Sequence, residues 1–214
     1  MIKQNTLYLL VLWYLSIPKW IQKCFPSLLW QAPSANEAVV YLTFDDGPHP
    51  EITPWVLNEL KQRGLKASFF CVGDNVRKFP ETYQQILEEG HVTANHTMHH
   101  MKGWSNSTEV YIQNTAEAAQ YIKSKLFRPP YGRISRAQIK ALLPEYTIVM
   151  WSLLSGDFDP HLNISKALNQ LKRHTKNGSI VVFHDSIKSE AQMKQLLPDY
   201  LDYLKANAYT CKTL

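Results

Sequence analysis

Cysteine is scarce in this chain of 214 residues, and the three cysteines stand far apart at positions 24, 71 and 211. Their number is odd and no C-x-x-C pair occurs, so the sequence provides neither a disulfide framework nor a cysteine-based zinc site. We therefore expect Cys24, Cys71 and Cys211 to be buried free thiols that act as small apolar side chains.

A strong charge bias is also missing. The 23 basic and 18 acidic residues give a formal net charge of +5, and they form no lysine or arginine stripe. Without such a stripe or a base-stacking motif we expect no nucleic-acid partner, whereas the mild positive excess favours an anionic surface such as a cell envelope. Repeats and low-complexity segments are absent too, so a content of 45% hydrophobic and 19% charged residues indicates one ordinary globular domain with a sizeable core.

The longest apolar run lies at the N-terminus. Residues 7–17 (LYLLVLWYLSI) are uncharged, but they are short for a membrane span, which needs about 20 residues. The run is typical of a signal-type apolar region, although no small-residue cleavage site follows closely. Residues 19–30 combine apolar, aromatic and basic side chains, as an interfacial helix does. Two interpretations of residues 1–36 stay open, a membrane anchor or a helix that closes the bottom of the domain, and residues 37–214 form the main domain.

From residue 39 onward, strand-like and helix-like segments alternate. Predicted strands cover residues 39–42, 66–72, 91–94, 146–153, 179–183 and 209–211, and predicted helices cover residues 52–63, 81–89, 108–126, 136–143, 164–173 and 192–205. This alternation predicts parallel βαβ units. About seven such units indicate an α/β barrel, complete or incomplete, rather than an open sheet.

Two adjacent carboxylates follow the first predicted strand. Asp45 and Asp46 come directly before Gly47 and Pro48, which end the strand. Neighbouring carboxylates repel each other, so we expect a cation beside them, either a metal ion or an arginine. The structural alternative is an Asx turn before Gly47.

Two histidines stand four residues apart after the third predicted strand. One helical turn would place His96 and His100 on the same face, a common arrangement for holding a divalent ion. On such a turn His99 points elsewhere. A surface cluster of histidines is the alternative interpretation. With one aspartate added, His96 and His100 would make a His2Asp site that leaves room for water, as catalytic metals require.

Further polar residues follow the later strands. In parallel α/β barrels the active groups lie at the C-terminal ends of strands, and Arg128, Tyr131, Asp157 and His184 all occupy such places. Asp157 could orient His184 for proton transfer. The alternative is that His184 is a satisfied residue of the core or rim.

Five sequence blocks together resemble a known family. They are TFDDGP (43–48), HTMHH (96–100), RPPYG (128–132), WSLLSGD (151–157) and VFH (182–184). Their order and spacing resemble those of the polysaccharide deacetylase family, also known as the NodB-homology group or carbohydrate esterase family 4. The resemblance extends from residue 39 to the C-terminus. It implies a distorted (β/α)7 barrel, classed as α/β, and metal-dependent removal of N- or O-acetyl groups from glycans.

The resemblance implies a metal triad and a catalytic base. Asp46, His96 and His100 match the family's metal ligands, so we expect one divalent ion, with zinc as the first choice and cobalt, manganese or nickel as alternatives. Asp45 matches the base that takes a proton from water, and Arg128 matches the arginine that pairs with this base.

The resemblance also implies an acid and a substrate pocket. His184 matches the histidine that protonates the leaving group, and Asp157 matches the acid that orients it. Tyr131 matches the residue whose backbone N–H faces the oxyanion. The residues expected to contact substrate are Trp151, Val182 and Pro129.

Three positions depart from the family pattern. Leu154 and Phe158 stand where the fourth block usually has an aspartate and a tryptophan, and Val182 replaces a larger leucine. None of these changes removes a metal ligand or a proton-transfer group, so they bear on which acyl group or glycan fits.

The resulting hypothesis is a monomeric deacetylase that acts on an acetylated glycan containing N-acetylglucosamine. A cell-envelope or membrane-associated location is favoured over a cytoplasmic one by the net charge and the apolar N-terminus. Two alternatives stay open: a glycan-binding protein that has lost turnover, and a metal-dependent amidase that acts on a smaller amide.

Overall fold

The computed structural model describes residues 17–32 and 38–214. The apolar run predicted at residues 7–17 therefore lies outside the described residues, apart from Ile17. Among the helices of the described ranges, none has both the length and the apolar character needed to cross a membrane.

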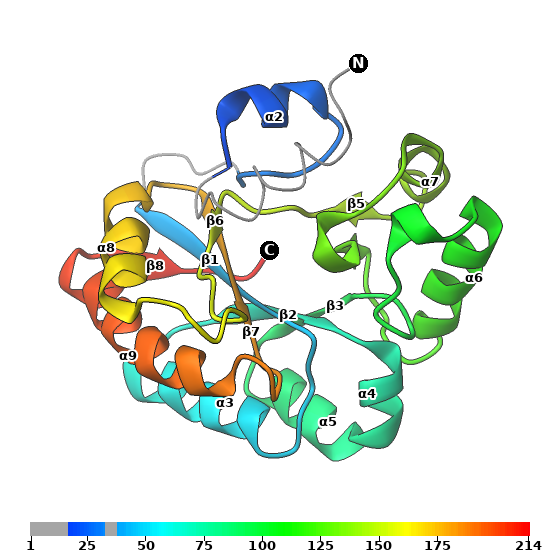
Figure 1. Cartoon of the computed structure of the whole chain (residues 1–214). Coiled ribbons are helices and arrows are strands. Elements are labelled where there is room, and N and C mark those ends of the chain that lie inside the picture. Colours follow the sequence, from blue (N-terminus) through cyan, green and yellow to red (C-terminus); the bar gives the residue numbers. More distant parts are fainter. Residues whose placement is uncertain (1–16, 33–37) are drawn as a thin grey trace.

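Parallel strands form one curled sheet (Figure 1). Its strands are β1 (Val39–Asp45), β2 (Ala67–Cys71), β3 (Val92–Asn95), β4 (Leu126–Phe127), β5 (Thr147–Ile148), β6 (Leu153–Leu154), β7 (Ser179–His184) and β8 (Thr210–Cys211). The order across the sheet is β5-β4-β3-β2-β1-β7-β6, and β8 pairs with the start of β1. All of these pairings are parallel, so the predicted distorted α/β barrel is confirmed.

Helices surround the strands on the outside of the curl (Figure 1). The described helices are α2 (Lys19–Cys24), α3 (Ile52–Arg63), α4 (Gly73–Lys78), α5 (Pro80–Glu88), α6 (Thr108–Ala118), α7 (Arg136–Leu142), α8 (Ile164–His174) and α9 (Glu190–Ala206), with 3-10 turns η1 (Gly103–Ser105) and η2 (Pro130–Gly132). Local sequence explains several boundaries. Ser135 and Gln138 form a capping box at the start of α7, and Gly64 ends α3 in a left-handed conformation.

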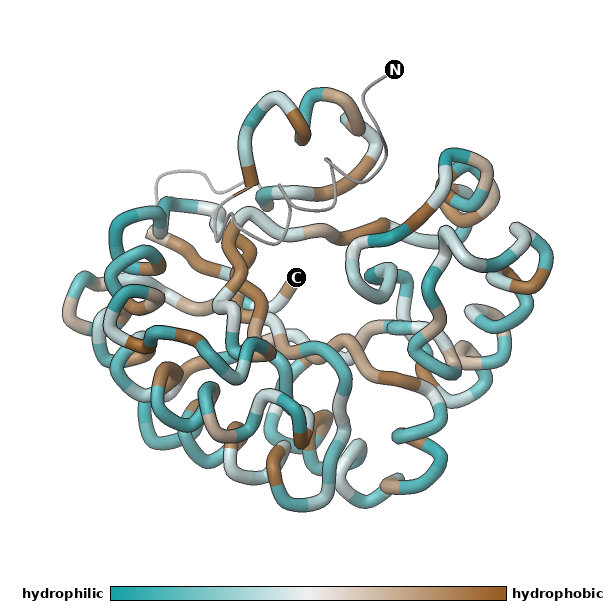
Figure 2. Tube along the Cα trace, in the orientation of Figure 1, coloured by the Kyte–Doolittle hydropathy of each residue, from teal (hydrophilic) through white to brown (hydrophobic). Residues whose placement is uncertain are grey.

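Alternate side chains of the central strands pack into two hydrophobic clusters. Leu42, Phe44 and Phe183 belong to the cluster shared with α3 and α9, on the outer face of the sheet. Ile180 and Val182 point the opposite way and belong to the second cluster. Figure 2 shows the hydrophobic residues concentrated along these central strands. Burial on both faces explains why β1 and β7 are apolar almost throughout.

The described N-terminal segment, residues 17–32, contacts the main domain. Leu29 N–H donates to Ile148 O at 2.9 Å, and Ala32 N–H donates to Gly178 O at 3.0 Å. The predicted helix over residues 19–30 is too long, because α2 ends at Cys24 and the chain then turns at Pro26 and Ser27 before it makes these contacts. The boundary at residue 36 stays a prediction.

The predicted strand over residues 146–153 is wrong. The structure divides it into β5, which pairs with β4, and β6, which pairs with β7 at the opposite edge of the sheet. The chain between them crosses from one edge to the other, where Val149 N–H donates to Phe127 O at 2.8 Å and Ser152 N–H donates to Ile180 O at 3.0 Å. A continuous apolar run does not reveal such a crossing.

Three smaller expectations also need correction. The helix predicted to reach residue 126 ends at Ala118, and β4 begins at Leu126. Helix α4 was not predicted. Cys71 and Cys211 are buried and free as expected, but Cys24, the last residue of α2, is exposed.

Candidate active site

A cavity of about 1070 Å³ opens where β1 and β7 end. The sequence-predicted site residues that line it are Asp45, Asp46, His96, His100, Tyr131, Trp151, Val182 and His184. Arg128 and Asp157 are fully buried and lie behind Asp45 and His184. These residues follow the C-terminal ends of different strands, and because the strands are parallel they lie together at one edge of the sheet.

Asp46, His96 and His100 converge on one point of this cavity. Their potential ligand atoms all lie within 4.8 Å of one another. The Asp46 Oδ1 atom is 3.0 Å from His100 Nε2 and 3.6 Å from His96 Nε2. Nδ1 of His96 donates to Arg128 O at 2.8 Å, which leaves the Nε2 lone pair directed at the other two groups.

The two histidines meet by a different route from the predicted helical turn. Residues 96–100 are irregular, and Thr97 (φ 65°) and His100 (φ 51°) adopt left-handed conformations. Asp46 (φ 81°) and Tyr131 (φ 61°) do the same at the same cavity. Such conformations cost non-glycine residues about 1–3 kcal/mol each, and they concentrate where surrounding contacts hold a functional geometry.

The donor set fits a divalent cation. Within the described part of the chain, the buried Asp46 Oδ1 forms no well-aligned hydrogen bond, although His100 Nε2 lies 3.0 Å away. Burial opposes ionisation of Asp46, but its contacts with His100 and His96 hold the pKa of this carboxyl well below its ordinary value. An ionised carboxylate and two imidazole nitrogens around one point are the ligand types that zinc and similar metals bind.

Arg128 holds Asp45 in place. Its guanidinium donates to Asp45 Oδ1 at 2.6 Å and to Thr43 Oγ1 at 2.8 Å, and it also donates to the backbone carbonyls of Val149 and Met150. All of these groups are buried, and burial lowers the pKa of Arg128 while Asp45 opposes that effect. The cation expected beside the paired aspartates therefore includes this arginine.

His184 is paired with Asp157 on the other side of the cavity. His184 Nδ1 lies 2.7 Å from Asp157 Oδ1, and the His184 backbone N–H donates to Asp157 Oδ2 at 2.8 Å. Burial would lower the pKa of His184, but Asp157 outweighs it and, with Asp46 and Asp45, raises that pKa to about 9. The pairing with Asp157 therefore favours the protonated form of His184.

The turn at Tyr131 lies beside the metal-ligand set. Its hydrogen bonds run from Gly132 N–H to Pro129 O and from Arg133 N–H to Pro130 O, and they leave out the Tyr131 N–H. The Tyr131 ring lies 4.6 Å from the His100 ring. Pro129 is buried and does not line the cavity, and its contact with substrate stays a prediction.

The three departures from the family pattern all line the cavity. Leu154, Phe158 and Val182 lie near Trp151 in its wall. The Phe158 ring stands edge-on to the His184 ring, with centroids 5.5 Å apart. These residues therefore shape the space beside the proposed proton donor.

A family model described as polysaccharide deacetylase matches residues 32–144. The chain belongs to the polysaccharide deacetylase family.

Relatives support this assignment over most of the chain. The chain is similar to a peptidoglycan-N-acetylglucosamine deacetylase of Bacillus cereus, with 35% identity over 86% of this chain and 90% of the relative. It is also similar to a chitooligosaccharide deacetylase of Azorhizobium caulinodans, with 31% identity over 74% of this chain and 80% of the relative.

The fold is similar to that of a solved deacetylase. The crystal structure of a peptidoglycan N-acetylglucosamine deacetylase in complex with 4-naphthalen-1-yl-N-oxidanyl-benzamide superposes with a TM-score of 0.79. The sequence identity is 31%, and the match covers 92% of this chain and 94% of that chain. The barrel described above is therefore the fold of this family.

Sequence reasoning assigned no role to several residues that support the polysaccharide deacetylase site. Thr43 accepts a hydrogen bond from Arg128, and Asn75 donates to Asp46 O at 2.7 Å. Asp185 is buried beside the turn that carries Asp45 and Asp46 (the acidic turn), and burial raises the pKa of the Asp185 carboxyl to about 8. Only Asp185 carried a sequence signal, because it directly follows His184 at a strand end.

Proposed function

We propose that this protein is a metal-dependent hydrolase that removes the N-acetyl group from an N-acetylglucosamine-containing glycan and releases acetate. The observation that carries the proposal is the Asp46–His96–His100 donor set, which has a buried, arginine-paired carboxylate on one side and an aspartate-paired histidine on the other. Peptidoglycan is the favoured glycan, because relatives of this chain are named for it.

Asp46, His96 and His100 would hold the divalent ion. When bound, such an ion supplies activation of water and polarisation of the acyl carbonyl. Zinc is the first choice for two imidazoles and one carboxylate, and cobalt, manganese and nickel are the alternatives.

Asp45 is the proposed general base. Its carboxylate lines the cavity, and the Arg128 contact at 2.6 Å fixes its orientation. It takes the proton of the attacking water as the bond to the acetyl carbon forms. The Tyr131 N–H donates to the carbonyl oxygen as negative charge develops there.

His184 is the proposed general acid. The Asp157 contact keeps it protonated and directs Nε2 away from Asp157. It gives its proton to the sugar nitrogen as the carbon–nitrogen bond breaks, so that a free amine and acetate leave. The base and the acid thus act from two separate pairs, Asp45 with Arg128 and His184 with Asp157, in one cavity.

Replacement of Asp45 by asparagine tests this assignment. We expect loss of acetate release from an N-acetylated oligosaccharide while bound metal, measured by elemental analysis, stays at the wild-type level. The exposed Asp199→Asn variant on α9 is the control and should keep wild-type turnover. Full turnover by Asp45→Asn would refute its role as the base.

The substrate is tested with a panel of glycans. Metal-loaded protein is incubated with peptidoglycan fragments, chitooligosaccharides and acetylated xylan, and the mass loss of one acetyl group is recorded. We expect loss from the first two groups. Acetyl loss from xylan alone would shift the proposal from amide to ester hydrolysis, and glycan binding without acetyl loss would support a binding protein.

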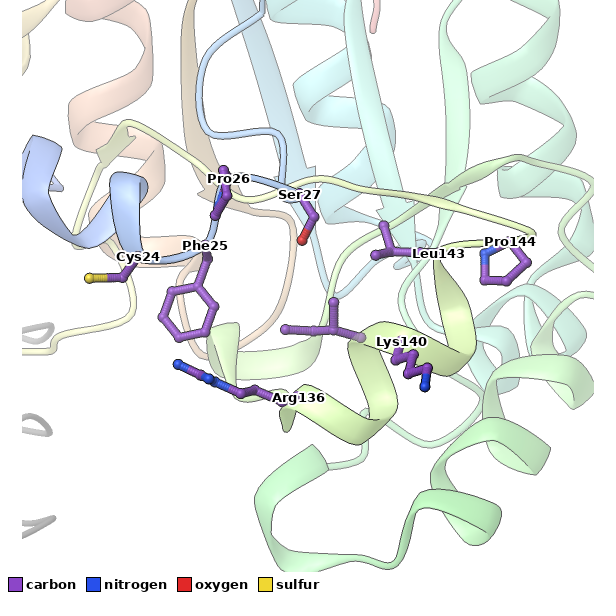
Figure 3. Close-up of a pocket in the computed structure, with 9 residues that line it drawn as sticks. Cys24, Phe25, Pro26, Ser27, Arg136, Lys140, Leu143 and Pro144 are labelled. Carbon is purple, nitrogen blue, oxygen red and sulfur yellow. The ribbon is translucent and has the colours of Figure 1, made fainter.

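We also propose that the face of the protein that carries α2 and α7 contacts an anionic membrane, in keeping with a cell-envelope location. No residue of α2 is buried, and Trp20 is 54% exposed between Lys19 and Lys23. A shallow hollow of about 500 Å³ lies beside α2 and carries Arg136 and Lys140 on its α7 side (Figure 3). An exposed tryptophan among basic residues is typical of a membrane-interface segment.

Vesicle sedimentation tests this contact. We expect the full chain to bind phosphatidylglycerol-containing vesicles, and the double variant Lys19→Gln/Lys23→Gln to bind less, whereas Lys166→Gln on α8 should bind as the wild type does. Equal binding by all three would contradict the proposal. The monomeric state and the lack of a nucleic-acid partner stay predictions.

A further inference from the structure

A buried carboxyl group lies directly behind the turn that carries Asp45 and Asp46. Asp185 is the residue that follows β7, and it is 1% exposed. No step of the proposed reaction uses it. Burying a carboxyl group costs free energy unless hydrogen bonds compensate, so its partners indicate why it is there.

Asp185 is bonded to both neighbours of Asp46. Its backbone N–H donates to Asp45 O at 3.1 Å, and its Oδ1 accepts from Gly47 N–H at 3.1 Å. The two hydrogen bonds hold the backbone on either side of Asp46, whose φ is 81°. Asn75 holds the remaining carbonyl, that of Asp46, at 2.7 Å.

Thr53 of α3 orients the Asp185 carboxyl. The Thr53 hydroxyl is fully buried and donates to Asp185 Oδ2 at 2.5 Å, and it accepts from His49 N–H at 2.8 Å. Its single proton is thereby committed to Asp185. Gly47 also lies so close to the Asp185 carboxyl that a Cβ atom at this position would clash with Asp185 Oδ2, so only glycine fits there.

We propose that Asp185, oriented by Thr53, is a positioning residue that holds Asp46 in its metal-binding conformation. This inference rests on the proposed metal site. Left-handed backbone is unfavourable for an aspartate, so the turn relaxes when its outer contacts are removed. The Asp46 carboxylate then no longer shares one point with His96 and His100. Partners of this kind, one step removed from the metal, typically change metal affinity by about 10- to 100-fold.

Thr53→Val and Thr53→Ser make a matched pair for the test. Valine keeps the volume but removes the hydroxyl, and serine restores it. Zinc affinity of the full chain is measured by competition with a chromogenic chelator, and the cobalt-loaded protein is examined by visible absorption. We expect about 10-fold weaker zinc binding and an altered cobalt spectrum for Thr53→Val, and values close to wild type for Thr53→Ser. Asp185→Asn should behave as Thr53→Val does.

Thr175→Val controls for general loss of stability. The Thr175 hydroxyl is also buried and bonded, to Leu171 O at 2.7 Å and to the Tyr200 hydroxyl at 2.9 Å, but it lies away from the acidic turn. We expect it to lower the stability of the metal-free protein and leave zinc affinity unchanged.

Wild-type zinc affinity and cobalt spectrum in a folded Thr53→Val protein would overturn the inference. If Asp185→Asn does not fold, Thr53→Val decides the question. Acetate release by the wild type is measured separately, so failure of the proposed function shows as no acetate release, whereas failure of the positioning role shows as unchanged metal affinity.

Discussion

Replacing Asp157 with asparagine is expected to move the alkaline limit of activity to lower pH. Burial would lower the pKa of His184, yet Asp157 at 2.7 Å helps to raise it to about 9 from the ordinary 6.5. Asparagine keeps the shape of the side chain but removes its charge. If the pKa of His184 returns toward 6.5, the protonated fraction at pH 8 falls from about 0.9 to about 0.03. We therefore expect kcat/KM to fall by about 30-fold at pH 8, but by less than about twofold at pH 6 through this cause.

The assay is acetate release measured as kcat/KM between pH 5.5 and pH 9.5. Loss of the orienting hydrogen bond adds a decrease that is the same at every pH, so the change in the shape of the profile is the diagnostic quantity. Asp159→Asn, an exposed residue of the same loop, is the control and should keep the wild-type profile. An alkaline limb that does not move in Asp157→Asn would refute the assignment of His184 as the acid.

Two predictions concern stability. Arg128→Met should lower the free energy of unfolding by about 3–5 kcal/mol, because it leaves the buried Asp45 carboxylate without its cation; urea denaturation of the metal-free protein measures this, and a change below about 1 kcal/mol would contradict it. Tyr111→Phe should raise that free energy by up to about 1 kcal/mol, because the Tyr111 hydroxyl is buried without a partner among the described residues; a loss of stability in the same assay would show that the hydroxyl is bonded.

Strand ends were the most informative feature of the sequence. β1 and β7 are long, apolar and bounded by clear turn residues, so the positions of Asp45, Asp46 and His184 at one end of the sheet could be predicted. Parallel pairing then required them to meet, and the register places Asp45 beside His184. Fold class and the general place of the site follow from this pattern alone.

Other features depend on contacts between residues far apart in the sequence. The spacing of His96 and His100 predicted a helical turn, but left-handed residues bring their rings together. Left-handed backbone is uncommon for any residue other than glycine, so the spacing alone does not reveal it. The crossing between β5 and β6 depends on which sheet edge each short piece pairs with, and an apolar run is the same in either case. Asp185 joined to Gly47 is likewise visible only in the folded chain.

Metal removal tests the central claim most directly. Acetate release from an N-acetylated oligosaccharide is measured on the wild-type protein after chelation and again after titration with zinc. Asp46, His96 and His100 around one point predict an inactive chelated protein whose activity returns in full with one equivalent of zinc. Full activity in the metal-free protein, or no recovery with any divalent ion, would contradict it.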